Sequence, residues 1–374
     1  MVVDLRRDHS FRVPRPDLSE RIGTPNACGG CHSDRTAGWA AAAIAGWTGG
    51  VRPAAGSGAE AIQAGRLRQA GACAPLAALA SDTSASPIVR ATAVSLLGAN
   101  TGKEQGPAIA AAARDPEPLI RLAAAEAIEA CPEEEQIRVG GPLLSDPVRA
   151  VRLQAARSLA GVPAERMGGL GRASETALGE WVESELHNAD TAGAHVNIGL
   201  MRLLRGKQDE AEAAYVRALE LDPLFVPALV NLADLRRIQG REAEAERLLR
   251  EACRIAPDSA PAAYGLGMSL MRSGRTADAI EALERAARRG ADDPRFAYTW
   301  GAALAQAGNE TRAAEVWEES LARHSGDPET LAALVQYDAA HGKRPKALAR
   351  ARVLASILPE DEGVRGLLRD LGKK

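Results

Sequence analysis

Two cysteines and a histidine near the N-terminus have the spacing that a covalently bound haem requires. They lie in the run Cys28-Gly29-Gly30-Cys31-His32, and Cys-x-x-Cys-His is the attachment motif of c-type haem. Two thiols one helical turn apart can each add to a vinyl group of the porphyrin, and the imidazole that follows then binds the iron. We therefore expect Cys28 and Cys31 to be the thioether anchors and His32 to be the proximal iron ligand.

Zinc and unmodified thiols are the alternatives for this motif. A structural zinc ion needs four ligands in a tetrahedron, but the next cysteine is Cys73, and adjacent residues such as Cys31 and His32 rarely reach one small ion. We favour haem, because 5 cysteines and 6 histidines in 374 residues seldom produce the motif by chance. The other cysteines are expected to be small buried hydrophobic residues. They are Cys73, Cys131 and Cys253.

A second iron ligand has one candidate, since His9 is the only other histidine in the first 180 residues. Pro14 and Pro16 follow it and favour an extended strand that can cross a haem face. His9 is therefore a candidate sixth ligand, and a surface histidine is the alternative. The first residues show no signal-peptide pattern, although haem of this type is attached outside the cytoplasm.

The C-terminal half repeats with a period of 34 residues. The repeated glycines are Gly206, Gly240, Gly274, Gly308 and Gly342, the alanines are Ala211, Ala245, Ala279, Ala313 and Ala347, and the large apolar residues are Tyr215, Leu249, Leu283 and Trp317. This is the pattern of the tetratricopeptide repeat (TPR): glycine at the turn between helices A and B, alanine where the helices approach, and a large side chain between units. Five units fit between about residues 192 and 361. We expect an extra helix at 176–187 and a capping helix at 362–374.

A shorter period of 31 residues precedes the TPR pattern and is marked by Arg90, Arg121 and Arg152. Asp115-Pro116 and Asp146-Pro147 each stand six residues before an arginine. This resembles HEAT-like repeats, in which Asp caps a helix, Pro begins it, and Arg reaches the Asp of the neighbouring unit. About three such helix pairs fit between residues 70 and 163. The glycine-rich segments 49–58 and 162–174 are expected to be linkers.

The predicted fold class is therefore all-α, with a short haem-binding N-terminal segment followed by two helical-repeat solenoids. We expect the haem segment at residues 1–50, HEAT-like repeats at 70–163 and a TPR superhelix with capping helices at 176–374. A net charge of −3 and a pI near 6.2 give no basic excess for binding nucleic acid. No run of about 18 apolar residues could cross a bilayer.

The inner face of the TPR array is a candidate peptide groove. Its expected residues are Asn197, Asn231, Tyr264 and Tyr298. Asparagine amides can bond an extended peptide backbone and tyrosine rings add contact area, while packing between helices is the alternative. The remaining histidines are expected to be solvated at helix ends. They are His187, His195, His324 and His341. Because no hydrolase motif or phosphate loop is present, an electron carrier or scaffold is favoured over a catalyst.

The chain resembles bacterial multihaem c-type cytochromes fused to HEAT and TPR repeats. The resemblance is carried by residues 8–16, 23–28 and 31–32, by Trp39 in the helix that follows, and by the two repeat arrays. The resemblance is most specific over residues 1–47. It implies covalent haem c, a redox partner protein, and a periplasmic or otherwise exported location. The arrays would then be docking surfaces for the redox partner or for a peptide or protein ligand of the TPR groove.

The chain departs from that family at its start. The family carries an export signal and further Cys-x-x-Cys-His sites upstream of the segment that matches residues 1–4, so we expect Met1 to be an internal start or the gene to be truncated. His9 could then belong to an upstream haem. A TPR/HEAT protein-binding scaffold with a vestigial haem site is the alternative function, and the non-catalytic tail of a multihaem enzyme is the third.

Overall fold

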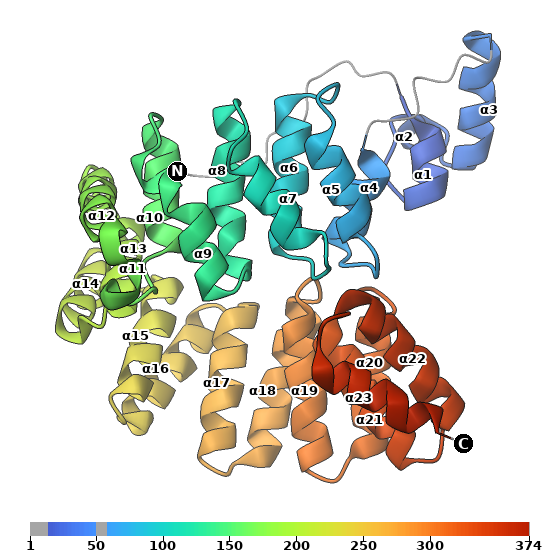
Figure 1. The fold of residues 1–374 in the computed structure, drawn as a ribbon. Helices are drawn as coiled ribbons and strands as arrows, with labels where there is room; N and C mark the ends of the chain where they lie inside the picture. Colours follow the sequence, from blue (N-terminus) through green and yellow to red (C-terminus); the bar gives the residue numbers. More distant parts are fainter. Residues whose placement is uncertain (1–13, 50–57, 374) are drawn as a thin grey trace. The chain divides into compact units, whose positions relative to one another are not determined.

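Helices make up all the regular structure of the described chain (Figure 1). The computed structural model describes residues 14–49 and 58–373, and these ranges contain no β-strand. The predicted all-α class is confirmed. The chain forms two units, Met1–Gln63 and Ala64–Lys374. None of the helices in the described ranges combines the length and the apolar character needed to traverse a bilayer.

The first unit contains three short helices with clear end signals. They are α1 (Pro16–Ile22), α2 (Cys28–Cys31) and α3 (Ala37–Trp47). Pro16 begins α1 at a position where its fixed φ favours a helix and no backbone N–H is needed. Gly23 ends α1 with a φ of 70°, a left-handed conformation that glycine adopts without a Cβ penalty. The Thr36 hydroxyl caps α3 by accepting a hydrogen bond of 3.2 Å from the Trp39 N–H.

The helices before residue 163 are joined by pairs of arginine and aspartate. They are α4 (Ala59–Arg66), α5 (Cys73–Ser81), α6 (Pro87–Gly98), α7 (Gln105–Ala112), α8 (Pro118–Ala127), α9 (Glu133–Gly140) and α10 (Arg149–Ser158). Arg90 on α6 pairs with Asp115. Arg121 on α8 donates two hydrogen bonds, of 2.6 and 3.0 Å, to the Asp146 carboxylate. The expectation that each arginine reaches the aspartate of the next unit is thus confirmed for both pairs.

Asp146 shows how such a buried carboxylate is accommodated. Burial raises its pKa, but the hydrogen bonds from Arg121 and from the Val148 N–H outweigh burial, so the net pKa is lowered. Arg152, the third arginine of the series, binds Glu180 instead, at 2.7 Å. Glu180 lies on α12 (Gly171–Leu186), whose N-terminal part occupies the expected linker.

The segment between the two arrays is more helical than its glycine content indicated. It contains α11 (Ala164–Met167) and α12 (Gly171–Leu186). The expected extra helix at 176–187 therefore begins five residues earlier, at Gly171. Trp181 and Leu178 of α12 are buried, and this burial holds the helix although glycine begins it.

Five helix pairs and a final helix follow. They are α13 (Ala192–Leu204), α14 (Gln208–Leu221), α15 (Val226–Ile238), α16 (Glu242–Ile255), α17 (Ala260–Arg272), α18 (Thr276–Arg289), α19 (Pro294–Gln306), α20 (Glu310–Leu321), α21 (Pro328–Ala340), α22 (Arg344–Ile357) and α23 (Glu362–Gly372). Each of the five repeated glycines, from Gly206 to Gly342, lies between the two helices of a pair, with a φ of 71° to 84°. Since L-residues are strained at such angles, the 34-residue glycine period marks the turns.

The repeated alanines and the repeated large apolar residues lie where these helices pack together, as the 34-residue period predicts. The five repeated alanines, from Ala211 to Ala347, are at most 1 % exposed. Tyr215 and Trp317 are buried, and each packs so closely on a glycine of the preceding helix, Gly199 or Gly301, that a Cβ there would overlap the ring. The predicted role of alanine is confirmed, and Tyr215 also packs in one cluster with Leu232 of the next helix pair, as expected for a large residue between units. The repeats therefore pack mainly through small residues, which agrees with an aromatic content of only 3 %.

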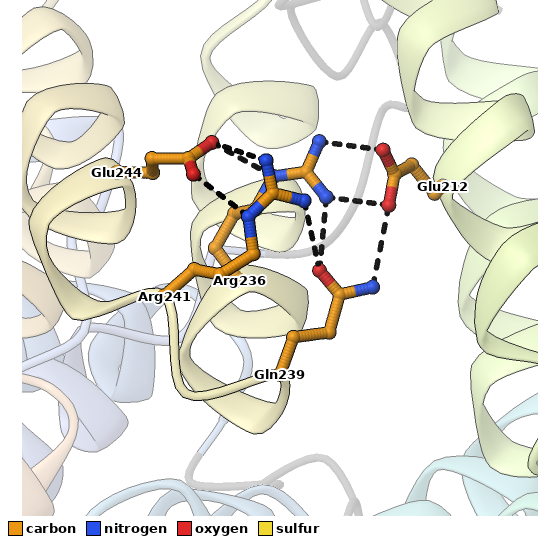
Figure 2. Close-up of polar contacts among 5 residues, drawn as sticks. All are labelled: Glu212, Arg236, Gln239, Arg241 and Glu244. Carbon is orange, nitrogen blue, oxygen red and sulfur yellow. Dashed lines mark hydrogen bonds and ion pairs between the residues drawn. The ribbon is translucent and has the colours of Figure 1, made fainter.

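A polar network joins the first two repeats and is drawn in Figure 2. Arg236 on α15 donates to both carboxylate oxygens of Glu212 on α14, with one bond of 2.6 Å, and also to the Gln239 amide oxygen at 2.9 Å. The Gln239 amide donates back to Glu212 at 3.2 Å. On the other side, Arg241 binds Glu244 of α16 in a bidentate pair of 2.6 and 2.7 Å. The hydrogen bond from Arg236 lowers the pKa of Glu212 to about 2.

The start of the second unit meets the loop between α20 and α21 in what we call the closure contact, formed by residues 67–70 and 324–326. The Gly326 N–H donates to the Arg68 carbonyl at 2.8 Å, and the Ala70 N–H donates to the Ser325 hydroxyl at 3.2 Å. The His324 ring lies 3.1 Å from the Leu67 carbonyl through Nδ1. Residues about 255 positions apart are therefore joined by three hydrogen bonds.

Candidate functional site

The Cys-x-x-Cys-His motif forms the short helix α2, which is held at its start by Asn26. The Asn26 side chain accepts a hydrogen bond of 3.2 Å from the Gly29 N–H and donates one of 2.8 Å to the Ser19 hydroxyl on α1. Cys28 and Cys31 occupy the two ends of this single turn. The local fold therefore holds the two thiols one helical turn apart, the arrangement that double thioether attachment needs.

Both thiols are free, and nothing crowds the turn between them. Cys31 is exposed and Cys28 is partly buried. Gly29 and Gly30 face open space, since a Cβ on either would meet no atom within 4 Å. The His32 ring packs on the Trp39 ring with 4.9 Å between centroids, and the ring nitrogens of His32 make no hydrogen bond in the described chain. The donor set and the open space around it fit a covalently attached porphyrin.

The site has two further predictions, a zinc ion as the alternative to haem and His9 as a second iron ligand. Among residues 14–49 and 58–373 no group of three or more His, Cys, Asp or Glu side chains could hold a metal ion, so the zinc alternative finds no additional ligands there. His9, the candidate sixth ligand, lies outside the described residues.

The other cysteines lie in the second unit, and two of them are buried as expected. Cys73 and Cys131 are buried, and burial raises the pKa of each thiol to about 11. Cys253 is partly buried, and burial raises its pKa as well. A thiol with a raised pKa is a poor nucleophile at neutral pH, so these residues serve packing.

Three of the four candidate groove residues of the TPR array line separate cavities along its A helices. The middle cavity, of about 440 Å³, lies against α15, α17 and the start of α19. Tyr264 lines it, stacks on Phe296 at 5.2 Å and carries the Arg295 guanidinium 5.3 Å from its ring centroid. Its three arginines each pair with a carboxylate at 2.8 to 3.2 Å. The pairs are Arg237 with Asp234, Arg272 with Glu242 and Arg295 with Asp293.

Tyr298, one repeat after Tyr264, lines a second cavity of about 540 Å³ that we call the far cavity. Its walls come from α19, α20 and α21, and they combine alanines, three aromatic rings and two glutamates. The residues are Tyr298, Ala302, Ala305, Glu310, Trp317, Glu329, Ala332, Ala333, Gln336, Tyr337, Ala340 and His341. The Trp317 Nε1–H donates to the Tyr298 carbonyl at 3.1 Å, which fixes the floor of the cavity.

The two asparagines have different surroundings. Asn197 lines a third cavity, of about 360 Å³, and its amide donates to Glu185 at 3.0 Å. Asn231 donates to the Pro227 carbonyl of its own helix at 2.8 Å and lines none of the three cavities. The structure therefore places Asn197, Tyr264 and Tyr298 at three cavities, and it places Asn231 at none of them.

The expectation that all four remaining histidines are solvated is wrong for His324. Its ring is only 2 % exposed, because residues 67–70 cover it in the closure contact. Nδ1 faces the Leu67 carbonyl at 3.1 Å and Nε2 faces the Ala291 carbonyl at 3.0 Å, so a neutral ring can donate to only one of them. His187 and His341 lie exposed at helix ends, and His195 is partly buried with Nε2 at 2.9 Å from the Ala189 carbonyl.

Comparison with known protein families identifies repeats in the same region. Tetratricopeptide repeat models match residues 202–260 and 236–299. No curated protein matches the chain. The similar solved structures include PilW, a type IV pilus biogenesis factor, which is 17 % identical over 60 % of this chain and 100 % of its own, with a TM-score of 0.44. They also include pilF of Pseudomonas aeruginosa, which is 19 % identical over 58 % of this chain and 99 % of its own, with a TM-score of 0.42. YrrB, a TPR protein with an unusual peptide-binding site, is 20 % identical over 50 % of this chain and 96 % of its own, with a TM-score of 0.39.

The repeat models and the helix pairs agree. Residues 202–299 match the family models, and the glycine turns and buried alanines continue with the same period to Ala347. The helix pairs from α13 to α22 therefore form a helical-repeat solenoid that contains tetratricopeptide repeats.

Proposed function

We propose that this protein is a binding scaffold whose TPR inner face takes an extended segment of a partner protein. The observation that carries the proposal is the row of cavities, of about 360, 440 and 540 Å³, along successive A helices. Each combines an apolar or aromatic floor with a few polar side chains at its edge, as protein-binding grooves do. The packing roles of Tyr264 and Tyr298 do not compete with this, since both are only partly buried.

The test is a selection of displayed peptides on the full chain, followed by direct titration of the peptides that it yields. Tyr264→Ala and Tyr298→Ala serve as groove variants, and Leu224→Ala, an exposed position outside the three cavities, is the control. We expect at least one groove variant to weaken the selected peptides tenfold or more, while the control binds as the wild type does. Peptides that bind all variants equally would show that the inner face is not the binding surface.

Residues 70–163 are proposed to be HEAT-like repeats that extend the scaffold. The two pairs Arg90–Asp115 and Arg121–Asp146 support this, because both span 25 residues and link equivalent positions of consecutive helix pairs. The same array contributes to the 360 Å³ cavity through Arg157 and Ser158 of α10. A partner segment at this cavity would contact both arrays.

A second candidate function is covalent haem c binding and electron transfer in a periplasmic or otherwise exported protein. It is supported by the free thiols of Cys28 and Cys31 at the two ends of one helical turn and by the unbonded ring of His32. Haem, when bound, would supply a one-electron carrier for a redox partner. Cys28 and Cys31 would anchor it, His32 would bind the iron, and His9 would be the second protein ligand of the iron.

The haem candidate is tested by exporting the chain behind an added signal peptide together with a haem-attachment system. We expect a Soret band and haem staining that survive denaturing electrophoresis, and their loss in Cys28→Ser/Cys31→Ser. An altered spectrum in His9→Ala would assign the sixth ligand. A colourless exported protein would leave the scaffold as the function.

A further inference from the structure

The far cavity differs from the middle cavity in the state of its charges. The arginines of the middle cavity are neutralised by carboxylates at 2.8 to 3.2 Å. In the far cavity the charged residues are carboxylates, and neither has a permanent cation. Glu329 makes no ion pair with any residue that the structure describes. Glu310 contacts only His341, through Nε2 at 3.3 Å, and this ring is a cation only when it is protonated.

The walls between these carboxylates favour a positive side chain. Tyr298, Tyr337 and Trp317 line the cavity, and the faces of aromatic rings attract cations. The chain already shows such a contact here, since the Lys343 amine lies 4.7 Å from the Tyr337 ring centroid. The alanines give the rest of the wall a smooth apolar surface, on which the methylene stem of a lysine can lie while its charged end stays polar.

The two carboxylates stand at opposite ends of α21. Glu329 is in its first turn, and Glu310, the first residue of α20, lies beside His341, which follows its last turn. Twelve residues at 1.5 Å of rise separate these ends by about 18 Å. An extended peptide covers that distance in about five residues.

We propose that the far cavity binds a basic extended segment of a partner protein, with cationic side chains about five residues apart that reach Glu310 and Glu329. This rests on the proposed scaffold function and names the chemistry of the partner. Charge complementarity selects this occupant, because an acidic segment would meet two unpaired carboxylates. Apolar contact with the alanines and tyrosines supplies the remaining surface.

The experiment is calorimetric titration of the full chain at low salt with an acetylated and amidated peptide in which four alanines separate two lysines. The control peptide carries norleucine, which keeps the stem and removes the charge, in place of both lysines. We expect the lysine peptide to bind at least tenfold more tightly. Glu310→Gln/Glu329→Gln should abolish this preference, and Glu319→Gln, an exposed position on α20 outside the cavity, should retain it. Circular dichroism melts verify that both variants are folded.

Three results would overturn the proposal: equal binding of the two peptides, no binding of either, or a preference that survives in the double variant. These results can be distinguished from a failure of the scaffold function. If peptides selected on the groove bind the wild type and Glu310→Gln/Glu329→Gln equally but are lost in the groove variants, the scaffold stands and only the basic segment is rejected.

Discussion

The closure contact permits a sharp test, because one added methyl group should open it. An alanine at Gly326 would place its Cβ 2.7 Å from the Arg68 carbonyl oxygen and 2.9 Å from both the Gln69 carbonyl carbon and the Ala70 nitrogen. All three are backbone atoms, which cannot rotate away as a flexible side chain can. The two segments must therefore separate by several tenths of an ångström.

The magnitude follows from the bonds that this separation breaks. Three hydrogen bonds join the segments, from Gly326 to Arg68, from Ala70 to Ser325 and between His324 and Leu67. At about 1 kcal/mol each they contribute about 3 kcal/mol, and relieving the overlap by any other route costs about 1–3 kcal/mol. Since 1.4 kcal/mol is a factor of ten, the opened form should become about 100-fold more populated.

Hydrogen exchange followed by mass spectrometry measures this directly. We expect the amides of Ala70 and Gly326 to exchange about 100-fold faster in Gly326→Ala than in the wild type, with little change in the helices of repeats one to three. Gly366→Ala is the control, because its Cβ would meet no atom within 4 Å. Equal exchange in Gly326→Ala and the wild type would refute the reasoning, since the contact would then not protect these amides.

Three other substitutions test the charges, the backbone conformation and the packing. Glu212→Gln should lower the free energy of unfolding by about 1–2 kcal/mol at pH 7, a value discounted because the Glu212 side chain is 30 % exposed. Because the folded pKa of Glu212, about 2, lies below its ordinary value of 4.5, this difference from the wild type should persist above pH 5 and vanish as the pH falls toward 2, and urea titrations at several pH values can follow it. Arg68→Gly should stabilise the closure contact by up to about 1 kcal/mol, because Arg68 has a φ of 46°, and slower exchange of the Gly326 amide would show it. Tyr215→Phe should raise the thermal midpoint or leave it unchanged, because the buried Tyr215 hydroxyl has no hydrogen-bond partner among the described atoms, and a fall of several degrees would reveal a missed partner.

The sequence predicts the repeat array well because each repeat carries the same local constraint. A glycine is needed at every left-handed turn, and alanine is needed where helices approach, so the 34-residue period records the geometry directly. The arginine–aspartate pairs are predictable for a similar reason, since both partners recur at a fixed spacing. Tyr264 and Tyr298 occupy one repeated position, and each lines a cavity beside its own A helix.

The closure contact carries no such signal. Most of its bonds use backbone groups, and it joins residues about 255 positions apart. His324 follows the end of α20 and resembles an ordinary helix-terminal histidine until residues 67–70 cover it. Asn231 lines none of the three cavities, and its amide donates a hydrogen bond to the Pro227 carbonyl four residues earlier on the same helix. Neither partner is visible in a pattern of residue types.

The closure contact and the far cavity share one helix, so they should be coupled. Asp327, next to Gly326, caps α21 by accepting a hydrogen bond of 2.9 Å from the Thr330 N–H, and Glu329 of the same turn lines the far cavity and a small cavity of about 160 Å³ at the closure contact. A shift of Gly326 therefore moves the first turn of α21 and one of the two carboxylates. The two-lysine peptide should bind Gly326→Ala several-fold more weakly than the wild type, while peptides confined to the middle cavity are unaffected. If the lysine peptide binds both proteins equally, the contact stabilises the solenoid without acting on its groove.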